Sequence, residues 1–253
     1  MANGFDPRGF ATPQPATTLG GRGVAVDAGL RSYMLSVYNY MASGVLLTGI
    51  AAMAMAETGA VNSLIAVRDN GSIGMSGLGW VVTLAPLALV FWLSFGINRM
   101  AASTAKMVFW AYAAIVGASL STLLLVYTGT SIAQTFFATA AAFGSLSLWG
   151  YTTKKDLSGW GSFLLIGVVG LLVAMLINAF WPSGPMGLAI SAIGVLIFAG
   201  LTAYDTQKIK SMYFVVAGNG EATAKSAVMG ALALYLDFLN MFLFLLRFMG
   251  DRR

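Results

Sequence analysis

The chain has 253 residues, of which 58% are hydrophobic and only 9% are charged. Soluble domains carry about 25% charged residues, so this composition indicates a protein whose natural solvent is lipid. The absence of Cys and His excludes disulfides, thiolate or imidazole metal sites, and Ser-His or Cys-His catalytic pairs. The net charge of +5 comes from scattered Lys and Arg rather than from a basic cluster, so we expect no nucleic-acid binding.

The N-terminal segment, residues 1–29, is polar, rich in Gly, Pro and Thr, and mixed in charge. It contains no apolar run long enough for the hydrophobic region of a signal peptide. We predict a disordered cytoplasmic tail over residues 1–29, followed by a transmembrane domain over residues 30–253.

Apolar stretches recur through the rest of the chain at the length that a membrane-spanning helix requires, about 20 residues. They predict an all-α membrane protein with seven spanning helices joined by short connections. The predicted spans are residues 33–56, 78–97, 107–127, 132–151, 160–181, 186–205 and 228–249. Small residues spaced four apart, Gly117 with Ser121 and Ala140 with Gly144, are predicted to let these helices pack closely.

Lys and Arg are distributed unevenly among the connections. Of the 14 in the chain, ten lie in the tail and in the second, fourth and sixth connections: Arg8, Arg22, Arg31, Arg99, Lys106, Lys154, Lys155, Lys208, Lys210 and Lys225. The first connection has only Arg68, so the positive-inside rule places the N-terminus in the cytoplasm. Seven spans then put the basic residues Arg247, Arg252 and Arg253 outside, against the same rule. We expect the last helix to span the membrane fully; a half-span that returns is the alternative.

Two aspartates lie in or beside apolar segments. Asp237 is near the middle of the last predicted helix, where a carboxylate costs about 2.5–3.5 kcal/mol and no Lys or Arg lies within one turn. Asp205 ends the sixth predicted helix. A structural role would be an ion pair with Lys208 for Asp205, or a hydrogen bond to a Tyr or Asn for Asp237. The functional alternative is a carboxyl pair that shares a proton or offers oxygen ligands to Ca²⁺. This alternative requires the sixth helix to continue past Tyr204, or the membrane surface to dip there.

The segments around these aspartates carry a family resemblance. Residues 204–209, Tyr-Asp-Thr-Gln-Lys-Ile, and residues 231–247, which include Leu-Tyr-Leu-Asp-Phe-Leu-Asn and Leu-Leu-Arg, resemble the two signature stretches of the Bax inhibitor-1 family, including its bacterial YccA-like members. The similarity continues through residues 117–121, 150–158 and 177–180, and covers nearly the whole chain after residue 30.

The resemblance implies a fold in which two helix triplets surround a central seventh helix. It implies a pH-sensitive calcium leak channel in the bacterial inner membrane, gated by an aspartate pair. By this resemblance, Asp205 and Asp237 form the pH sensor and the ion pathway and provide any ligands for a transiently bound calcium ion. Arg99 is the residue that would act as a latch. Since no acid lies between Asp69 and Asp156, the second helix supplies no third carboxylate. We expect a monomer without a resident cofactor.

Two other functions compete with the channel. Resemblance to the YccA-like members implies regulation of the membrane protease FtsH through protein contacts, with the N-terminal tail as the contact; this role is compatible with a leak. An intramembrane aspartyl protease would need a Gly-x-Gly-Asp stretch, whereas bulky residues, Leu234-Tyr235-Leu236, precede Asp237. The chain also lacks a Gly-x-x-x-x-Gly-Lys phosphate loop, so we expect no enzyme.

The topology can be tested by site-specific labelling, because the native chain has no Cys to give background labelling. We predict that Ser63→Cys, in the first connection, reacts with a membrane-impermeant thiol reagent in intact cells. Lys154→Cys should react only after the cells are opened. The reverse pattern would overturn the assigned orientation.

Overall fold

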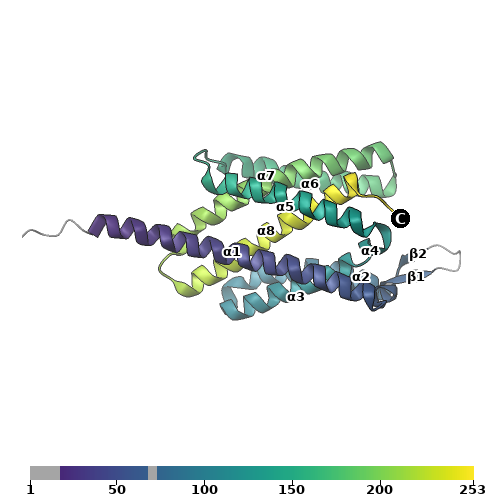
Figure 1. Cartoon of the computed structure of the whole chain (residues 1–253), viewed down its shortest axis with the longest axis horizontal. Coiled ribbons are helices and arrows are strands. Elements are labelled where there is room, and N and C mark those ends of the chain that lie inside the picture. Colours follow the sequence, from purple (N-terminus) through teal and green to yellow (C-terminus); the bar gives the residue numbers. More distant parts are fainter. Residues whose placement is uncertain (1–17, 68–72) are drawn as a thin grey trace, which may run out of the picture.

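The computed structural model describes residues 18–67 and 73–253, with side chains for residues 28–66 and 74–253, and is mostly helical (Figure 1). Seven helical segments in this part of the chain are long and apolar enough to cross a membrane, which confirms the predicted all-α membrane fold. The α-helices are α1 (Thr18–Glu57), α2 (Gly77–Gly96), α3 (Ala102–Leu120), α4 (Leu123–Val126), α5 (Gly129–Thr152), α6 (Ser158–Phe180), α7 (Gly184–Val216) and α8 (Gly220–Met249). The short α4 completes the third span, and the 3-10 turn η2 (Ile97–Arg99) follows α2.

Helix α8 is the centre of the bundle. It packs against α1 and α3 on one side and against α5 and α7 on the other, while α2 covers α3 and α6 covers α7. Figure 1 shows α8 running obliquely between these two groups. In the most apolar stretch of α8, 67% of the residues are buried, against at most 39% in the other spans. The predicted arrangement of two triplets around the seventh spanning helix is therefore confirmed.

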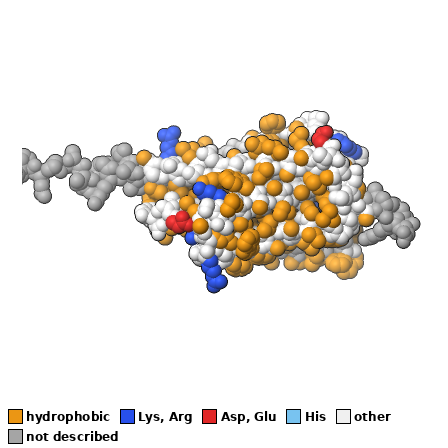
Figure 2. Space-filling model, turned by 90° about the horizontal axis from the view of Figure 1, so that it is seen from below, with side chains coloured by type: hydrophobic (Ala, Val, Ile, Leu, Met, Phe, Trp, Pro, Cys, Tyr) orange, Lys and Arg blue, Asp and Glu red, His pale blue; other side chains and the backbone are white. Residues whose placement is uncertain are grey.

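The outer helices expose large apolar side chains, as a lipid-facing surface requires. Trp80, Phe91 and Phe95 of α2 and Phe163 and Ile166 of α6 are all more than half exposed. In Figure 2 hydrophobic side chains cover the middle of the visible face, and charged side chains gather towards its two ends. This pattern matches a bilayer that surrounds the middle of the bundle.

The sixth and seventh spans are longer than the hydropathy pattern predicts. Helix α7 continues past Asp205 to Val216, and α8 already begins at Gly220. The extension of α7 is polar, but its polar groups bond within the protein: Thr206 Oγ1 lies 2.9 Å from Ser147 Oγ, and Lys210 Nζ donates to the Tyr151 carbonyl at 2.8 Å. The hydropathy pattern shows where the lipid-facing part of a helix ends, but α7 itself continues beyond that point.

Two further features differ from the sequence-based expectation. Helix α1 begins at Thr18, so residues 18–29 of the predicted disordered tail are helical; residues 1–17 lie outside the described residues. The first connection contains a 3-10 turn, η1 (Ala60–Leu64), and an antiparallel pair of strands, β1 (Ile65–Val67) and β2 (Ile73–Met75), in which Ile65 pairs with Met75.

The last helix is continuous over its 30 residues, about 45 Å, which excludes the half-span alternative. The residues after it, 250–253, form a C-terminal segment that bonds to the chain around the start of α5. Thr128 N donates to the Asp251 carbonyl at 3.1 Å, and Arg253 N donates to the Val126 carbonyl at 2.9 Å. These bonds fix the end of α8 to the connection between the two triplets, where α4 ends and α5 begins.

Small residues permit close helix contacts at some of the expected positions. A Cβ at Gly117 would clash with the backbone of Thr48 on α1, so the predicted packing role is confirmed there. Gly150 similarly lies against the backbone of Ala203 on α7. The prediction is wrong for Gly144, which is exposed and would meet no atom within 4 Å of an added Cβ.

Gly150 and Gly144 lie on the same helix and provide a matched pair of variants. Gly150→Ala should lower the stability of the bundle by about 1–3 kcal/mol, because α5 and α7 must move apart to admit the methyl group. Gly144→Ala should leave stability unchanged or slightly raised, since Ala is the better helix former. Thermal unfolding in detergent measures both. Equal melting temperatures for the two variants would contradict the close α5–α7 contact.

Candidate functional site

The structure brings Asp205 and Asp237 together at the contact between α7 and α8. Their carboxyl groups lie within hydrogen-bonding reach of each other, and Asp237 is buried, with 3% of its surface exposed. Two carboxyl groups can hydrogen-bond to each other only when one of them carries a proton. The pair is possible because α7 continues past Tyr204, which was the condition set by the sequence. Asp237 Oδ2 is buried and has no hydrogen-bond partner among the described residues.

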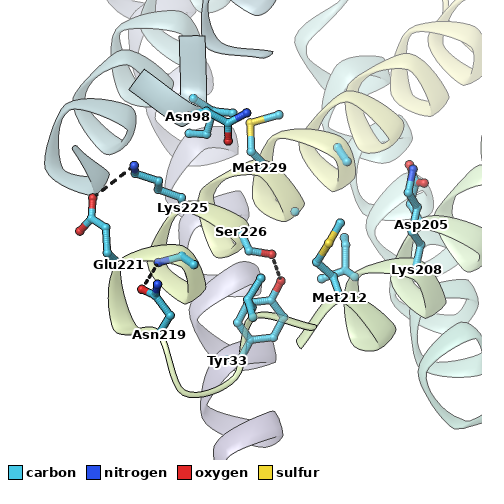
Figure 3. A pocket seen from close by; sticks show the side chains of 16 residues that line it. Tyr33, Asn98, Asp205, Lys208, Met212, Asn219, Glu221, Lys225, Ser226 and Met229 are labelled. Carbon is cyan, nitrogen blue, oxygen red and sulfur yellow. Dashed lines mark hydrogen bonds and ion pairs between the residues drawn. The ribbon is translucent and has the colours of Figure 1, made fainter. Parts of the chain in front are cut away.

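A cavity of about 570 Å³ leads to the pair from one end of the bundle. We call this the basic end; it is formed by the connections at residues 97–102, 152–158 and 216–220. Figure 3 shows the cavity between α7, which contributes Asp205 and Lys208, and the start of α8, with Asn98 beside it. The innermost lining residue of α8 is Ala233, one turn before Asp237. Asp205 therefore lies between the cavity and Asp237.

Beyond the pair, towards the opposite end, the contact between α7 and α8 is apolar. The rings of Phe198 and Phe244 stack with centroids 5.9 Å apart, and Met241 is fully buried beside them. Leu171 and Ile190 complete this cluster. An ion gains no oxygen ligand from these side chains. The structure therefore shows Asp205 accessible from the cavity at one end and an apolar cluster on the other side of the pair.

The residues that follow Asp205 hold its helix in place. Thr206 is fully buried and bonds to Ser147 of α5. The side-chain oxygen of Gln207 accepts a hydrogen bond from Leu157 N at 2.8 Å, and its nitrogen donates to the Lys155 carbonyl at 2.8 Å. These three bonds fix α7 to α5 and to the connection between α5 and α6, which accounts for the polar residues of this signature stretch.

Asp156 belongs to another part of the resemblance but not to this site. It is exposed in the connection between α5 and α6, where its Oδ1 accepts a hydrogen bond from Ser158 N at 2.9 Å. Hydrogen bonds from the Ser158 side chain and backbone lower the pKa of the Asp156 carboxyl. Its role is to cap the start of α6, which lacks a side-chain cap from Leu157.

Neither predicted cationic partner pairs with the aspartates. Lys208 Nζ lies 5.8 Å from the centre of the Tyr204 ring, and the one ion pair among the described side chains joins Lys225 to Glu221 at 3.6 Å. The structural interpretation of Asp205 as an ion-pair partner of Lys208 is therefore not observed. Arg99 is exposed at the end of η2, and the structure does not bring it to either carboxyl group.

No sequence pattern predicts the contacts that form the rim of the cavity. Glu221 Oε1 accepts a hydrogen bond from Ala102 N at 2.7 Å, which ties the start of α8 to the start of α3. Tyr33 Oη lies 2.8 Å from Ser226 Oγ and ties α1 to α8 (Figure 3). The partners are 119 and 193 residues apart in sequence, so no local pattern links them.

The Asp205–Asp237 pair offers few oxygen ligands to a metal ion. No group of three or more Asp or Glu side chains that could hold a metal ion occurs within residues 28–66 and 74–253. Asp205 and Asp237 thus offer two carboxyl groups within this part of the chain. Tight Ca²⁺ sites use six to eight oxygen ligands, so this geometry suits a brief contact with a hydrated cation better than storage.

Comparisons with known proteins show which family the chain resembles. A family model described as "Inhibitor of apoptosis-promoting Bax1" matches residues 30–253. Protein RP147 of Rickettsia prowazekii is 48% identical over 227 residues, which cover 90% of this chain and 92% of that protein. A Caulobacter vibrioides protein is 45% identical over 247 residues, 97% of this chain and 98% of its own length. Inner membrane protein YbhL of Escherichia coli is 44% identical over 227 residues, 89% and 94% of the two chains. The chain therefore belongs to the Bax inhibitor-1 family.

Proposed function

We propose that this protein is a pH-sensitive cation leak channel of the bacterial inner membrane, held closed by the hydrogen-bonded pair Asp205–Asp237. The observation that carries the proposal is this pair at the inner end of a cavity, with an apolar cluster beyond it. The membrane assignment draws support from the seven apolar helices and from the relative named an inner membrane protein. The distribution of Lys and Arg supports a cytoplasmic basic end and N-terminus.

A shared proton accounts for the pH sensitivity. The closed pair requires one proton between the two carboxyl groups. When the pH rises and this proton leaves, two negative charges face each other in a medium of low dielectric, and their repulsion drives α7 and α8 apart. Flux should therefore be low at acidic pH and rise with pH. In this proposal Arg99, next to the cavity-lining Asn98, pairs with the Asp205 carboxylate once it is released.

The chemistry of the opened pair favours a hard cation such as Ca²⁺. Its ligands are carboxylate oxygens, and Asp237 Oδ2 is a buried acceptor that remains unused in the closed state of the described structure. A cation between the two carboxylates also offsets their repulsion. Because only two carboxyl groups are present, the cation is bound weakly, and conduction requires an ion that can leave as well as enter.

Cation flux into proteoliposomes tests the proposal. For the native protein, flux should increase with pH. Asp237→Asn, Asp205→Asn and the double variant should each show flux that no longer depends on pH, because Asn keeps the shape and hydrogen bonding but cannot titrate. Each single variant should match the double, since the pair acts as a unit. Asp156→Asn, the same chemical change at an exposed acid, should retain the native profile.

Two outcomes of this assay would contradict the channel. If the flux of the double variant still depends on pH, the pH sensor is not the aspartate pair. If the purified protein passes no cations at any pH, it is not a leak channel. This outcome would leave the regulatory role, in which the protein acts through contacts with a membrane protease of the FtsH type.

A further inference from the structure

A second cavity, of about 640 Å³, lies at the end of the bundle opposite the basic end. It lies between the end of α6, the start of α7, the end of α8 and the C-terminal segment. Its polar lining includes Asn178, Ser183, Arg247 and Arg252, and its apolar lining includes Met175 and Leu188. It takes no part in the proposed ion pathway, because the apolar cluster around Phe198 and Phe244 separates it from the aspartate pair.

The two arginines that line the cavity have no acidic partner among the described residues. Arg247 and Arg252 lie where the positive-inside rule disfavours basic residues. No Asp or Glu lines the cavity, and neither guanidinium forms an ion pair within the part of the chain that the structure describes. Two guanidinium groups in one cavity without an acidic partner favour an anionic ligand, above all a phosphate, whose oxygens match the guanidinium fork.

The C-terminal segment holds Arg252 in position before any ligand binds. Tyr127 and Arg252 form an antiparallel bridge, and the guanidinium carbon lies 5.9 Å from the centre of the Tyr127 ring. The residues on either side are fixed as well: Asp251 N donates to Ser131 Oγ at 2.9 Å, and Arg253 N donates to the Val126 carbonyl at 2.9 Å. A fixed backbone lowers the entropy lost when the side chain binds a ligand.

The surroundings of the cavity favour a lipid over a free anion as the source of such a phosphate group. Phe180 and Trp181, at the end of α6, are 71% and 73% exposed. Aromatic residues of this kind gather at the level of the lipid headgroups. The apolar lining side chains Met175 and Leu188 lie on the parts of α6 and α7 that continue towards the bilayer interior. A ligand with a phosphate head and an apolar tail fits both parts of the lining, whereas a free phosphate fits only the first.

We propose that this cavity binds the headgroup of an anionic phospholipid, with Arg247 and Arg252 as the phosphate ligands. The lipid joins the ends of α6, α7 and α8, which accounts for basic residues at the end of the bundle where the charge rule disfavours them. Basic pockets between transmembrane helices bind anionic headgroups by the same combination of charge and apolar contact.

The test is lipid binding to delipidated protein in detergent, measured by native mass spectrometry and by thermal stabilisation. Phosphatidylglycerol should bind more tightly than phosphatidylcholine with the same acyl chains. Arg247→Gln and Arg252→Gln should each weaken phosphatidylglycerol binding about fivefold, and the double variant about 25-fold, the change expected for basic residues near an anionic surface. Arg253→Gln is the matched control, because Arg253 lies in the same segment but does not line the cavity.

Three results would overturn the proposal. If Arg253→Gln weakens binding as much as the other variants do, the effect comes from general surface charge and not from the cavity. If the double variant binds phosphatidylglycerol with native affinity, the two arginines are not the phosphate ligands. Equal stabilisation by inorganic phosphate would show that the ligand is a free anion and not a lipid. If a Gln variant melts below the native protein without lipid, Arg247→Lys with Arg252→Lys replaces it. That variant keeps the charge but loses the fork, and should still bind more weakly than the native chain.

Discussion

The burial of the Asp205–Asp237 carboxyl pair inside the membrane is the constraint on which the rest of the bundle depends. A carboxyl group at mid-membrane cannot face lipid, because it would lose its hydration without compensation. The helix that carries Asp237 must therefore lie inside the protein, and α8 is the most buried span. Its partner must come from a helix in contact with α8 along its length, which is α7. The two triplets enclose the carboxyl pair and keep it away from lipid.

The bundle is polar along α7 and α8 at one end and apolar beyond the pair. On the basic side the two helices carry Lys208 and Lys225 around a cavity. On the other side they meet through stacked aromatic rings. Helix α8 is also fixed to the first triplet, since Tyr235 Oη lies 2.6 Å from Thr48 Oγ1, which in turn donates to the Ala113 carbonyl at 2.9 Å. A separation of α8 from α7 would therefore move the two triplets relative to each other, with little change inside the first.

Much of this architecture follows from the sequence, and the reason for each failure is physical. Hydropathy predicts the number of spans, and a lone acid in an apolar segment predicts the buried carboxyl. The ends of α7 and α8 could not be predicted, because bonds such as Thr206–Ser147 satisfy polar groups across helices. The spacing of small residues cannot show which side of a helix faces a neighbour, so it predicts a packing role for Gly144, which is exposed. The cavity rim depends on Glu221, whose partner on α3 is far away in sequence.

Gln207 gives the buried pair a connection to the membrane surface. It lies two residues after Asp205 on the same helix, and its amide holds the connection between α5 and α6 through two hydrogen bonds. A rotation of α7 that withdraws Asp205 from Asp237 would displace that amide in the same movement. The 153–157 loop would then shift or lose its anchor. The protonation state of a group inside the bilayer would thus be translated into the shape of an exposed loop, which a neighbouring protein can read without any ion crossing the membrane.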